Sequence, residues 1–260
     1  MKGTILKNEK LNNKYSLMEI ESSEFVKGAK PGQFLMIKAG LQNYLSDPLL
    51  RRPFGIVDVN GDSFRVLYML VGKGTRLMTE SPVGSTIEFS CGVGNGFKPL
   101  QNKNIALVAG GVGIAPLLWI AKILKNEGCN ISLYFGGRTE EDIVLIQEFR
   151  PHIDKLFITT NDGSKGEKGF VTEPFKRDIK NFDHVYSCGP KKMLQAVSAI
   201  CTENNVSVDI SIDERMACGL GACLGCIIYV KEGDEVVQKR CCVEGPVFDG
   251  KKVVWESICR

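Results

Sequence analysis

Closely spaced cysteines near the C-terminal end of the sequence are the residues best suited to chemistry. In the stretch ACGLGACLGC, Cys218, Cys223 and Cys226 follow the spacing C-x4-C-x2-C. An adjacent pair, Cys241 and Cys242, comes later. This spacing with a distant fourth cysteine is that of plant-type [2Fe–2S] clusters. The intervening glycines allow the backbone to curl tightly and to point N–H groups at the sulfurs, so the pattern predicts a [2Fe–2S] cluster.

Two other interpretations of these cysteines remain open. A structural zinc ion also takes four cysteines, although usually as two separated pairs. Buried inert thiols are the second alternative, but packing alone hardly explains three thiols within nine residues. The fourth ligand is ambiguous between Cys241 and Cys242. Neighbouring side chains on an extended segment point to opposite faces, so only one of the two should reach the cluster.

A glycine-rich turn near residue 110 has the chemistry of a phosphate-binding site. The stretch NIALVAGGVGIAPLL joins an apolar strand pattern to a helical pattern, and its turn contains Gly110, Gly111 and Gly113. Glycines permit close approach of a ligand, and the free N–H groups at a helix N-terminus favour a pyrophosphate. Pro116 stands where the G-x-G-x-x-G pattern has its third glycine, so a plain tight turn is the alternative.

A second turn of the same kind follows a later apolar run. Cys188, Gly189 and Pro190 close the stretch HVYSCGP before the helical pattern KKMLQAVSAICTENN. Both turns are expected at the carboxyl edge of one parallel sheet, where open α/β sheets bind their ligands. Cys188 is therefore either a packed core thiol or part of the lining of a nicotinamide site.

Two arginines interrupt the apolar stretch LLRRPFGIVDV in the N-terminal part of the chain. They need either solvent or an anionic partner. The guanidinium of Arg52 offers the fixed bidentate geometry that suits a cofactor diphosphate, and a solvated pair at a strand edge is the alternative. The stretch GKGT at 72–75 begins a helical pattern and is a second candidate for phosphate contact.

The elements that must position these residues fall into three parts. Residues 1–100 contain short β-branched or aromatic runs separated by turn signals, which predicts an antiparallel barrel. Residues 101–208 alternate apolar strand patterns with helical patterns, which predicts a parallel α/β sheet, and 140–153 (EEDIVLIQEFRPHI) is predicted as one helix. Residues 209–260 contain the cysteines and two strand patterns, a hairpin-like one at 226–238 and another at 251–256.

Composition and charge exclude several classes of protein. The 260 residues include 33 basic and 30 acidic ones, a balance that does not favour nucleic acid or an acidic surface as partner. No apolar run reaches membrane-spanning length, and the first residues lack the apolar core of a signal peptide. A cytoplasmic protein is therefore expected. Because the cytosol keeps thiols reduced, the ten cysteines are not expected to form disulfides.

Three motifs together resemble the ferredoxin-reductase superfamily: RPFG at 52–55, the turn at 110–116 and CGP at 188–190. This resemblance implies a flavin-binding barrel followed by a nicotinamide-nucleotide domain. The C-terminal stretches ERMACGLGACLGC and CCVEGPVF narrow the resemblance to the electron-transfer subunit of the NAD-dependent, type B dihydroorotate dehydrogenase. It covers essentially the whole chain, and it makes 209–260 an iron–sulfur domain.

The resemblance also implies which residues bind the cofactors. FAD would contact Arg52, Pro53, Phe54, Gly55, Leu67, Tyr68, Met69, Gly74 and Thr75. NAD would contact Gly110, Gly111, Gly113, Cys188, Gly189 and Pro190. The family usually has serine at position 55 and arginine at position 69, so those flavin contacts differ in this chain. The family's last cysteine precedes a motif that begins here at Cys242, which favours Cys242 as the fourth ligand beside Cys218, Cys223 and Cys226.

The function implied by the resemblance is a relay of electrons. Dihydroorotate would be oxidised on an FMN-containing catalytic subunit, and electrons would pass through the [2Fe–2S] cluster and FAD to NAD⁺, since a flavin exchanges one electron or two. Two copies of each subunit would form a heterotetramer. NAD rather than NADP is implied by the family alone, because Arg138 and Asp162 give the ribose region mixed charge. No base for dihydroorotate is evident, and the histidines at 152 and 184 have the pattern of surface or helix-end residues.

Two alternatives of different kinds remain. The small subunit of the bifurcating NADH-dependent ferredoxin:NADP oxidoreductase also resembles the chain from end to end, but it has Asp at the position of Cys218. A zinc-stabilised flavodomain that acts as a binding or regulatory module would have no electron output. Colour separates an iron–sulfur electron-transfer subunit from the zinc-stabilised module, because a [2Fe–2S] protein is red-brown whereas zinc adds no colour to a yellow flavoprotein.

Overall fold

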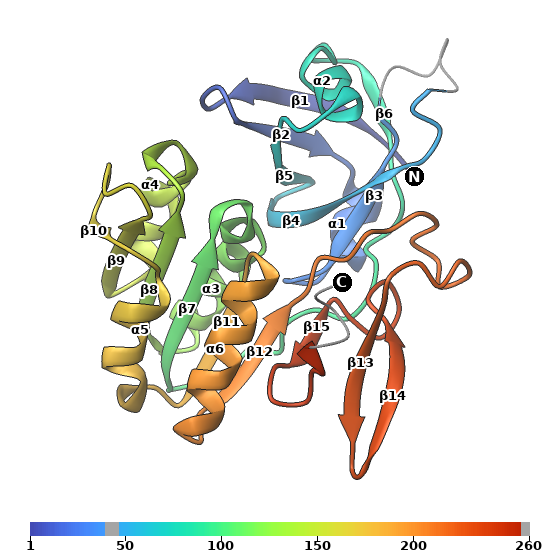
Figure 1. Ribbon diagram of the computed structural model, residues 1–260. Coiled ribbons are helices and arrows are strands. Elements are labelled where there is room, and N and C mark those ends of the chain that lie inside the picture. Colours follow the sequence, from blue (N-terminus) through green and yellow to red (C-terminus); the bar gives the residue numbers. More distant parts are fainter. Residues whose placement is uncertain (40–46, 256–260) are drawn as a thin grey trace.

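The computed structural model describes residues 1–39 and 47–255. It contains an antiparallel barrel, a parallel α/β sheet and a cysteine-rich C-terminal part (Figure 1). The fold class predicted from the sequence is thereby confirmed. The positions of the predicted domain boundaries, at 100/101 and 208/209, stay predictions.

Six strands form the barrel in the order β3-β4-β5-β2-β1-β6, and all neighbouring pairs are antiparallel. They are β1 (Lys2–Lys10), β2 (Tyr15–Glu21), β3 (Phe34–Ile37), β4 (Arg52–Asn60), β5 (Ser63–Met69) and β6 (Thr86–Glu88). Bridges from β3 to Phe89 and Val93, just after β6, join the two ends of this sheet. The helix α1 (Ser23–Gly28) follows β2, and α2 (Lys73–Thr79) follows β5.

Seven strands form the second sheet in the order β10-β9-β8-β7-β11-β12-β15. They are β7 (Asn104–Gly110), β8 (Asn130–Gly137), β9 (Lys155–Thr160), β10 (Glu167–Lys168), β11 (His184–Cys188), β12 (Ser207–Ser211) and β15 (Val247–Asp249). All are parallel except β15. Because β7 and β11 are neighbours, the turns that follow them lie side by side at the carboxyl edge.

Helices cover both faces of the second sheet. The helix α3 (Ala115–Asn126) shares one apolar cluster with Ile105 and Leu107 of β7. The helices α5 (Thr172–Asp178) and α6 (Lys191–Glu203), with the short η4 (Ile179–Asn181) after α5, share the cluster of Ala106 and Val108. Successive residues of β7 therefore face opposite layers, as its continuous apolar run predicts for a strand buried on both sides.

The predicted single helix at 140–153 is wrong. The structure has three short turns of helix there: η2 (Glu140–Asp142), α4 (Ile146–Phe149) and η3 (Arg150–His152). The carboxylate of Asp142 accepts hydrogen bonds from the backbone N–H groups of Arg138 and Thr139, which holds a turn at this point. Leu145 then adopts a left-handed φ of 61°, which a continuous right-handed helix does not allow.

The predicted strand at 251–256 is wrong for its described part, residues 251–255. Within that part, strand pairing consists of an isolated bridge between Val253 and Val230. Val253 and Trp255 are buried in the core, so their apolar character reflects packing rather than a strand. The strand lies earlier, as β15, which pairs with β12. Glu256 lies outside the described residues.

The hairpin-like stretch is confirmed as a two-stranded sheet of β13 (Ile227–Glu232) and β14 (Glu235–Arg240). Ile228 and Val230 of this hairpin pack in the same apolar cluster as Ile210 of β12 and the helices α5 and α6. The cysteine-rich part is therefore anchored on the edge of the second sheet (Figure 1).

Candidate functional site

The cysteine-rich loop at 218–226 and the turn at 241–242 bring four thiols together as two pairs. The Sγ atoms of Cys226 and Cys242 are 3.3 Å apart, and both residues are buried. Cys223 is exposed and Cys218 is half-buried, and their thiols are hydrogen-bonded to each other. Among the described residues, no three Cys, His, Asp or Glu side chains already form a closed metal-binding group. The loop thus supplies soft sulfur donors in two pairs rather than a closed tetrahedral shell.

Backbone N–H groups point at the sulfurs of this loop, as its glycine-rich spacing predicts. The N–H groups of Leu220 and Cys223 each donate to Cys218 Sγ at 3.4 Å, and that of Gly225 donates to Cys223 Sγ at 3.4 Å. The bonds from Leu220 and Cys223 lower the pKa of the Cys218 thiol to about 6. The thiolate, which is the metal-binding form, therefore predominates at neutral pH.

The two adjacent cysteines have different surroundings. Burial and the neighbouring Cys226 raise the pKa of Cys242 to about 11, and the charge of Cys218 adds to the increase. Cys242 thus lies within electrostatic reach of Cys218 as well as of its own partner, Cys226. Cys241 is completely buried in the apolar cluster, and burial raises the pKa of its thiol strongly. The geometry favours Cys242 as the residue that faces the loop, in line with the sequence prediction.

Glycines give this loop its path and its place against the barrel. Gly219 and Gly221 have φ angles of 65° and 79°, a left-handed conformation that suits glycine. A methyl group on Gly219 would lie 2.5 Å from Cγ of Met36 on β3. The cysteine-rich loop therefore packs directly on the barrel, where Figure 1 shows it beside β3.

The two turns at the carboxyl edge of the parallel sheet touch each other. Gly111 opens the 3-10 helix η1 (Gly111–Ile114), which leads into α3. A methyl group on Gly113 would lie 2.3 Å from the carbonyl oxygen of Cys188, and one on Gly110 would lie 2.7 Å from Cδ of Pro190. Close packing between the two turns therefore requires glycine at positions 110 and 113, independently of any ligand.

Cys188 lies at the meeting point of the two turns. Only 9% of its surface is exposed, and burial raises the pKa of its thiol to about 12. The thiol is accordingly neutral and has no nucleophilic character at physiological pH. The structure shows Cys188 as a packed thiol where the two turns meet, and its place in the lining of a nicotinamide site stays a prediction.

Two of the three predicted flavin segments meet at Arg52. A methyl group on Gly74 would lie 2.7 Å from Nε of Arg52, so the arginine side chain passes over the start of α2. The hydroxyl of Thr75 accepts hydrogen bonds from the N–H groups of Val71 and Gly72, which fixes the first turn of this helix. The Arg52 guanidinium donates to the carbonyl of Leu50. A cation and a short helix start therefore lie together on the barrel rim.

The third predicted flavin segment lies at the end of β5, and its side chains alternate in direction. Tyr68 is buried in the barrel interior, where its hydroxyl donates to Asn8 Oδ1 at 2.8 Å and its ring packs edge-on against Phe54. Leu67 points the other way, into the apolar cluster of the parallel sheet, and Met69 is exposed. The side chain of Tyr68 is therefore taken up by the core.

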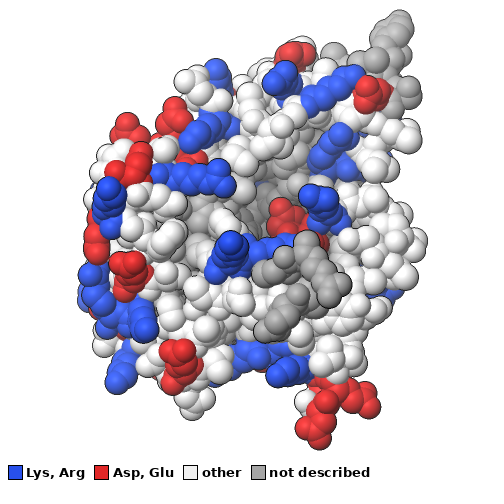
Figure 2. Space-filling model, in the orientation of Figure 1, with Lys and Arg blue, Asp and Glu red and all other residues white. Residues whose placement is uncertain are grey.

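The predicted flavin segment at 52–55 and the predicted nucleotide turn at 110–116 face each other across the junction of barrel and sheet. A methyl group on Gly55 would lie 3.6 Å from Pro116, and one on Gly111 would lie 3.5 Å from the hydroxyl of Tyr15. In Figure 2, Lys and Arg side chains border the hollow between the barrel and the sheet. A basic border suits phosphate-bearing cofactors.

Three residues near these turns were not singled out from the sequence. Asp213 follows β12, is exposed to solvent, and interacts electrostatically with both Cys188 and Cys241. Desolvation of its carboxyl by the surrounding atoms and the charge of Glu214 raise the pKa of Asp213 to about 6. Glu214 is ion-paired with Lys191, the first residue of α6. The signal in the sequence is an acidic pair directly after a strand of the parallel sheet.

Comparison with known proteins identifies the family. Residues 213–254 match the iron–sulfur cluster binding domain of dihydroorotate dehydrogenase B, and residues 107–199 match the oxidoreductase NAD-binding domain. The "Dihydroorotate dehydrogenase B (NAD(+)), electron transfer subunit" of Caldanaerobacter subterraneus subsp. tengcongensis is 38% identical over 257 residues, 98% of each chain. The chain belongs to this family of electron transfer subunits. The subunit of Clostridium perfringens is 39% identical over 254 residues, 97% of each chain.

Solved structures of other oxidoreductases share the fold of this chain. A chain from the structure of the NADH-dependent reduced ferredoxin-NADP oxidoreductase has a TM-score of 0.86 and 32% identity, over 99% of this chain and 92% of that one. The ferredoxin reductase in carbazole 1,9a-dioxygenase has a TM-score of 0.65 at 18% identity, over 79% and 66% of the two chains, and shares the fold.

The family assignment confirms several predictions. The chain is an NAD-linked oxidoreductase subunit with an iron–sulfur cluster binding domain and an NAD-binding domain, and the family implies a flavin. As an electron transfer subunit it has a catalytic partner subunit. In the described part of the chain, no helix combines the length and apolarity needed to span a membrane.

Proposed function

We propose that this chain takes electrons from the FMN of a dihydroorotate-oxidising subunit through a [2Fe–2S] cluster to FAD, and from FAD to NAD⁺. Dihydroorotate loses two electrons and two protons to become orotate. NAD⁺ takes up both electrons and one proton to become NADH, and the other proton is released. A flavin is needed between the cluster and NAD⁺ because it exchanges electrons singly or in pairs. The observation that supports this order is that the cysteine-rich loop packs on β3 and the nucleotide turn packs on Gly55, both on the barrel.

The two pairs of thiols suggest how the cluster is held. Cys218 and Cys223 would bind one iron, and Cys226 and Cys242 would bind the other. The N–H groups directed at Cys218 and Cys223 would stabilise the negative charge of a reduced cluster, which is one of the means by which proteins tune its potential. Cys241 would support the site from the core without binding iron.

The barrel residues suggest how FAD is held. Arg52 would bind the diphosphate together with the helix start at Gly74 and Thr75. The segment 52–55 would contact the flavin, with Gly55 offering backbone alone. Leu67, Tyr68 and Met69 would contribute mainly backbone groups, since Leu67 and Tyr68 are buried.

The turns at the carboxyl edge suggest how NAD is held. The N–H groups of η1, which contains Gly111 and Gly113, would receive the pyrophosphate, with Gly110 directly before them. Cys188, Gly189 and Pro190 would form the wall beside the nicotinamide. Residues 1–100, 101–208 and 209–260 would thus act as FAD, NAD and cluster domains, in the cytoplasm, where thiols stay reduced.

An apolar rim around the exposed Cys223 suggests where the partner subunit docks. Leu220 is 77% exposed, Leu224 is 55% exposed and Val243 is 39% exposed. Exposed apolar side chains gathered around one feature are typical of protein interfaces. Docking of the FMN-containing subunit on this rim would bring its flavin close to the cluster, and two copies of each subunit would form the heterotetramer.

Substitution of the exposed ligand tests the proposed relay. In Cys223→Ser we expect loss of the cluster iron and of dihydroorotate-dependent NAD⁺ reduction, while FAD stays bound. Cys91→Ser is the matched control, because Cys91 is also an exposed cysteine but lies outside the loop. Iron analysis, the EPR spectrum of the reduced protein and coupled turnover with the partner subunit are the measurements. Normal coupling in Cys223→Ser would refute the relay.

The division of labour between the subunits has its own test. The chain alone should oxidise NADH with artificial acceptors and leave dihydroorotate untouched. Iron, sulfide and zinc analysis of anaerobically purified protein decides between the cluster and the zinc alternative in the same preparation. Dihydroorotate oxidation by this chain alone would contradict the assignment of that step to the partner.

A ferredoxin-linked role is the second candidate, because the similarity to the NADH-dependent reduced ferredoxin-NADP oxidoreductase covers almost the whole chain. Reconstitution separates the two functions. Mixing the chain with a dihydroorotate-oxidising subunit should restore dihydroorotate-dependent NADH formation, whereas a ferredoxin-linked subunit would require reduced ferredoxin.

A further inference from the structure

One face of α3 lies along β4 of the barrel. Pro116 at its start packs on Gly55, at 3.6 Å from the position of an added methyl group. Trp119 packs against the barrel core, and Nζ of Lys122 is 2.5 Å from Oδ2 of Asp58. These three helix residues are spaced three apart, so they share one face. The helix that begins at the nucleotide turn is therefore attached to the flavin strand over two turns.

Asp58 is the centre of a charged network between the barrel and the sheet. Its side chain is almost completely buried, and Nε and Nη2 of Arg65 on β5 donate to its two oxygens at 2.7 Å each. Nη2 of Arg65 also reaches Oε2 of Glu148 on α4. Barrel and sheet thus contribute two charged residues each: Asp58 and Arg65 from the barrel, Lys122 and Glu148 from the sheet.

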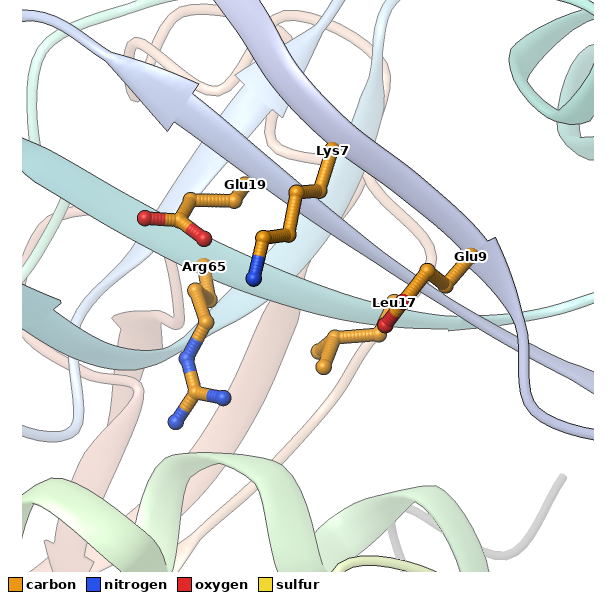
Figure 3. A pocket seen from close by; sticks show the side chains of 5 residues that line it. All are labelled: Lys7, Glu9, Leu17, Glu19 and Arg65. Atoms are coloured by element: carbon orange, nitrogen blue, oxygen red, sulfur yellow. The ribbon is translucent and has the colours of Figure 1, made fainter.

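The local backbone directs the charged side chains of this network toward the junction between the barrel and the sheet. A β-bulge between Ile56 and Asp58 shifts the register of β4 against β5, and Asp58 pairs directly with Arg65 across the two strands. In Figure 3 the guanidinium of Arg65 points toward the green helix and away from Glu9. The side chains of Asp58 and Arg65 therefore lie outside the barrel interior and face α3 and α4.

The charges are embedded in an apolar junction. Leu17, Val57 and Leu67 of the barrel belong to the same apolar cluster as Leu117 and Leu118 of α3. Apolar contact is non-directional, so by itself it permits small sliding or rotation of the helix on the strand. A buried carboxylate must keep its hydrogen-bonded partners, because leaving it unpaired is strongly unfavourable. The network therefore selects one placement of α3 among those that the apolar surface allows.

We infer that Asp58, Arg65 and Lys122 form a positioning lock that sets the placement of the nucleotide turn against the flavin segment, and thereby the rate of hydride transfer. This inference rests on the proposed function. On β4, Asp58 is three residues from Gly55, and on α3, Lys122 is six residues from Pro116, so the lock and the Gly55–Pro116 contact belong to one rigid unit. Lys122 and Asp58 touch no reacting atom and are positioning residues.

Lys122→Met and Lys125→Met in the full FAD-loaded chain test the lock. Lys125 is the matched control, because it lies on the same helix but pairs with Asp154 within the same sheet domain. Flavin bleaching after rapid mixing with NADH measures hydride transfer at saturating NADH. We expect a rate about tenfold lower in Lys122→Met, because small misplacement of reacting groups costs rate steeply. The half-saturating NADH concentration and the rate of reduction by dithionite should stay within twofold of wild type.

A second readout needs no cofactor. Hydrogen–deuterium exchange of the FAD-free chain should increase at 111–116 and in β4 in Lys122→Met, and should remain at the wild-type level there in Lys125→Met. Lys122→Arg, which keeps a donor for Asp58, should restore both the hydride-transfer rate and the protection. If Lys122→Met does not fold, Glu148→Gln weakens the half-buried end of the network and should give a smaller change in the same direction.

The outcomes are distinct. A wild-type hydride-transfer rate in Lys122→Met, or an equal loss in Lys125→Met, would overturn the lock. Failure of the wild-type chain to reduce its flavin with NADH would instead overturn the proposed function. In that case the exchange experiment alone still decides whether the network holds α3 on β4.

Discussion

The nucleotide turn at 110–116 and the cysteine-rich loop at 218–226 are both rich in glycine, but for different physical reasons. In the nucleotide turn, a methyl group on Gly113 would strike the backbone of Cys188 at 2.3 Å. In the cysteine-rich loop, Gly219 and Gly221 have left-handed φ angles, and N–H groups turn toward sulfur. Gly113 is needed for space, whereas Gly219 and Gly221 are needed for their left-handed backbone conformation as well as for space.

This difference has consequences for rigidity and for ligands. The nucleotide turn is packed between two parallel strands and a helix, so it is pre-formed before any nucleotide binds. The cysteine-rich loop is largely exposed on one side and holds its thiols as two pairs without a closed shell. We therefore expect cluster binding to complete the order of the loop, as metal binding does in many small sites.

The largest expected effect compares the two adjacent cysteines. Cys242→Ser should lose essentially all cluster iron, because the buried Cys226–Cys242 pair would then lack one donor. Cys241→Ser should keep the iron and lose about 1–2 kcal/mol of stability, since a hydroxyl replaces a thiol in an apolar cluster. Iron analysis and urea unfolding of both variants are the measurements. Iron loss in Cys241→Ser with retention in Cys242→Ser would reverse the assignment.

The next effect tests whether the nucleotide turn needs glycine because no larger side chain fits there. Gly113→Ala should destabilise the protein by about 3 kcal/mol, because the carbonyl of Cys188 is backbone and cannot move aside cheaply. Gly28→Ala is the control, since nothing lies within 4 Å of an added methyl group there. Urea unfolding monitored by far-UV circular dichroism gives the free energies. Equal stability of the two variants would show that the turns are not tightly packed.

A smaller effect tests whether the cysteine-rich loop needs glycine for its left-handed backbone conformation. Gly221→Ala should cost about 1–2 kcal/mol, because an L-residue is strained at its φ of 79°. It should also lower iron retention during gel filtration, because the methyl group would press on Val243 beside Cys242. Gly61→Ala has a similar φ of 56° in open space and should show the strain without the iron loss. Unchanged iron retention in Gly221→Ala would separate loop conformation from cluster binding.

The smallest effect concerns Asp213, which lies between the nucleotide turn and Cys241. Desolvation by the surrounding atoms and the charge of Glu214 raise the pKa of Asp213 to about 6, so the folded protein holds this proton to higher pH than the unfolded chain. The associated stability is present below about pH 4 and is lost as pH rises to about 6. Because the carboxyl is accessible and screened, we expect a loss of at most about 1 kcal/mol.

Unfolding of the wild type and of Asp213→Asn between pH 4 and pH 7 measures this effect. The variant should lack the decline in stability that the wild type shows over this range. Parallel curves for the two proteins would indicate that Asp213 titrates alike in the folded and unfolded states.

Most of the fold was predictable because it follows from local pattern. Alternation and apolar runs gave the barrel strands and the strands β7, β8, β9 and β11, and the predicted helices after β7 and β11 are confirmed, whereas β10, β12 and β15 were not predicted. The failures are at 140–153, where Asp142 and Leu145 break a helical pattern, and at 251–255, where buried Val253 and Trp255 mimic a strand. In both stretches, tertiary packing accounts for the apolar residues that periodicity alone assigned to regular structure.

The sequence by itself determined the chemistry of the thiols and the class of fold, because cysteine spacing and residue periodicity are local properties of the chain. The tertiary structure decided which of two adjacent thiols faces the loop, which glycines are needed for space, and that Asp58 meets Lys122. These depend on contacts between residues far apart in the chain, and no local pattern encodes which distant backbone or charge will be the neighbour.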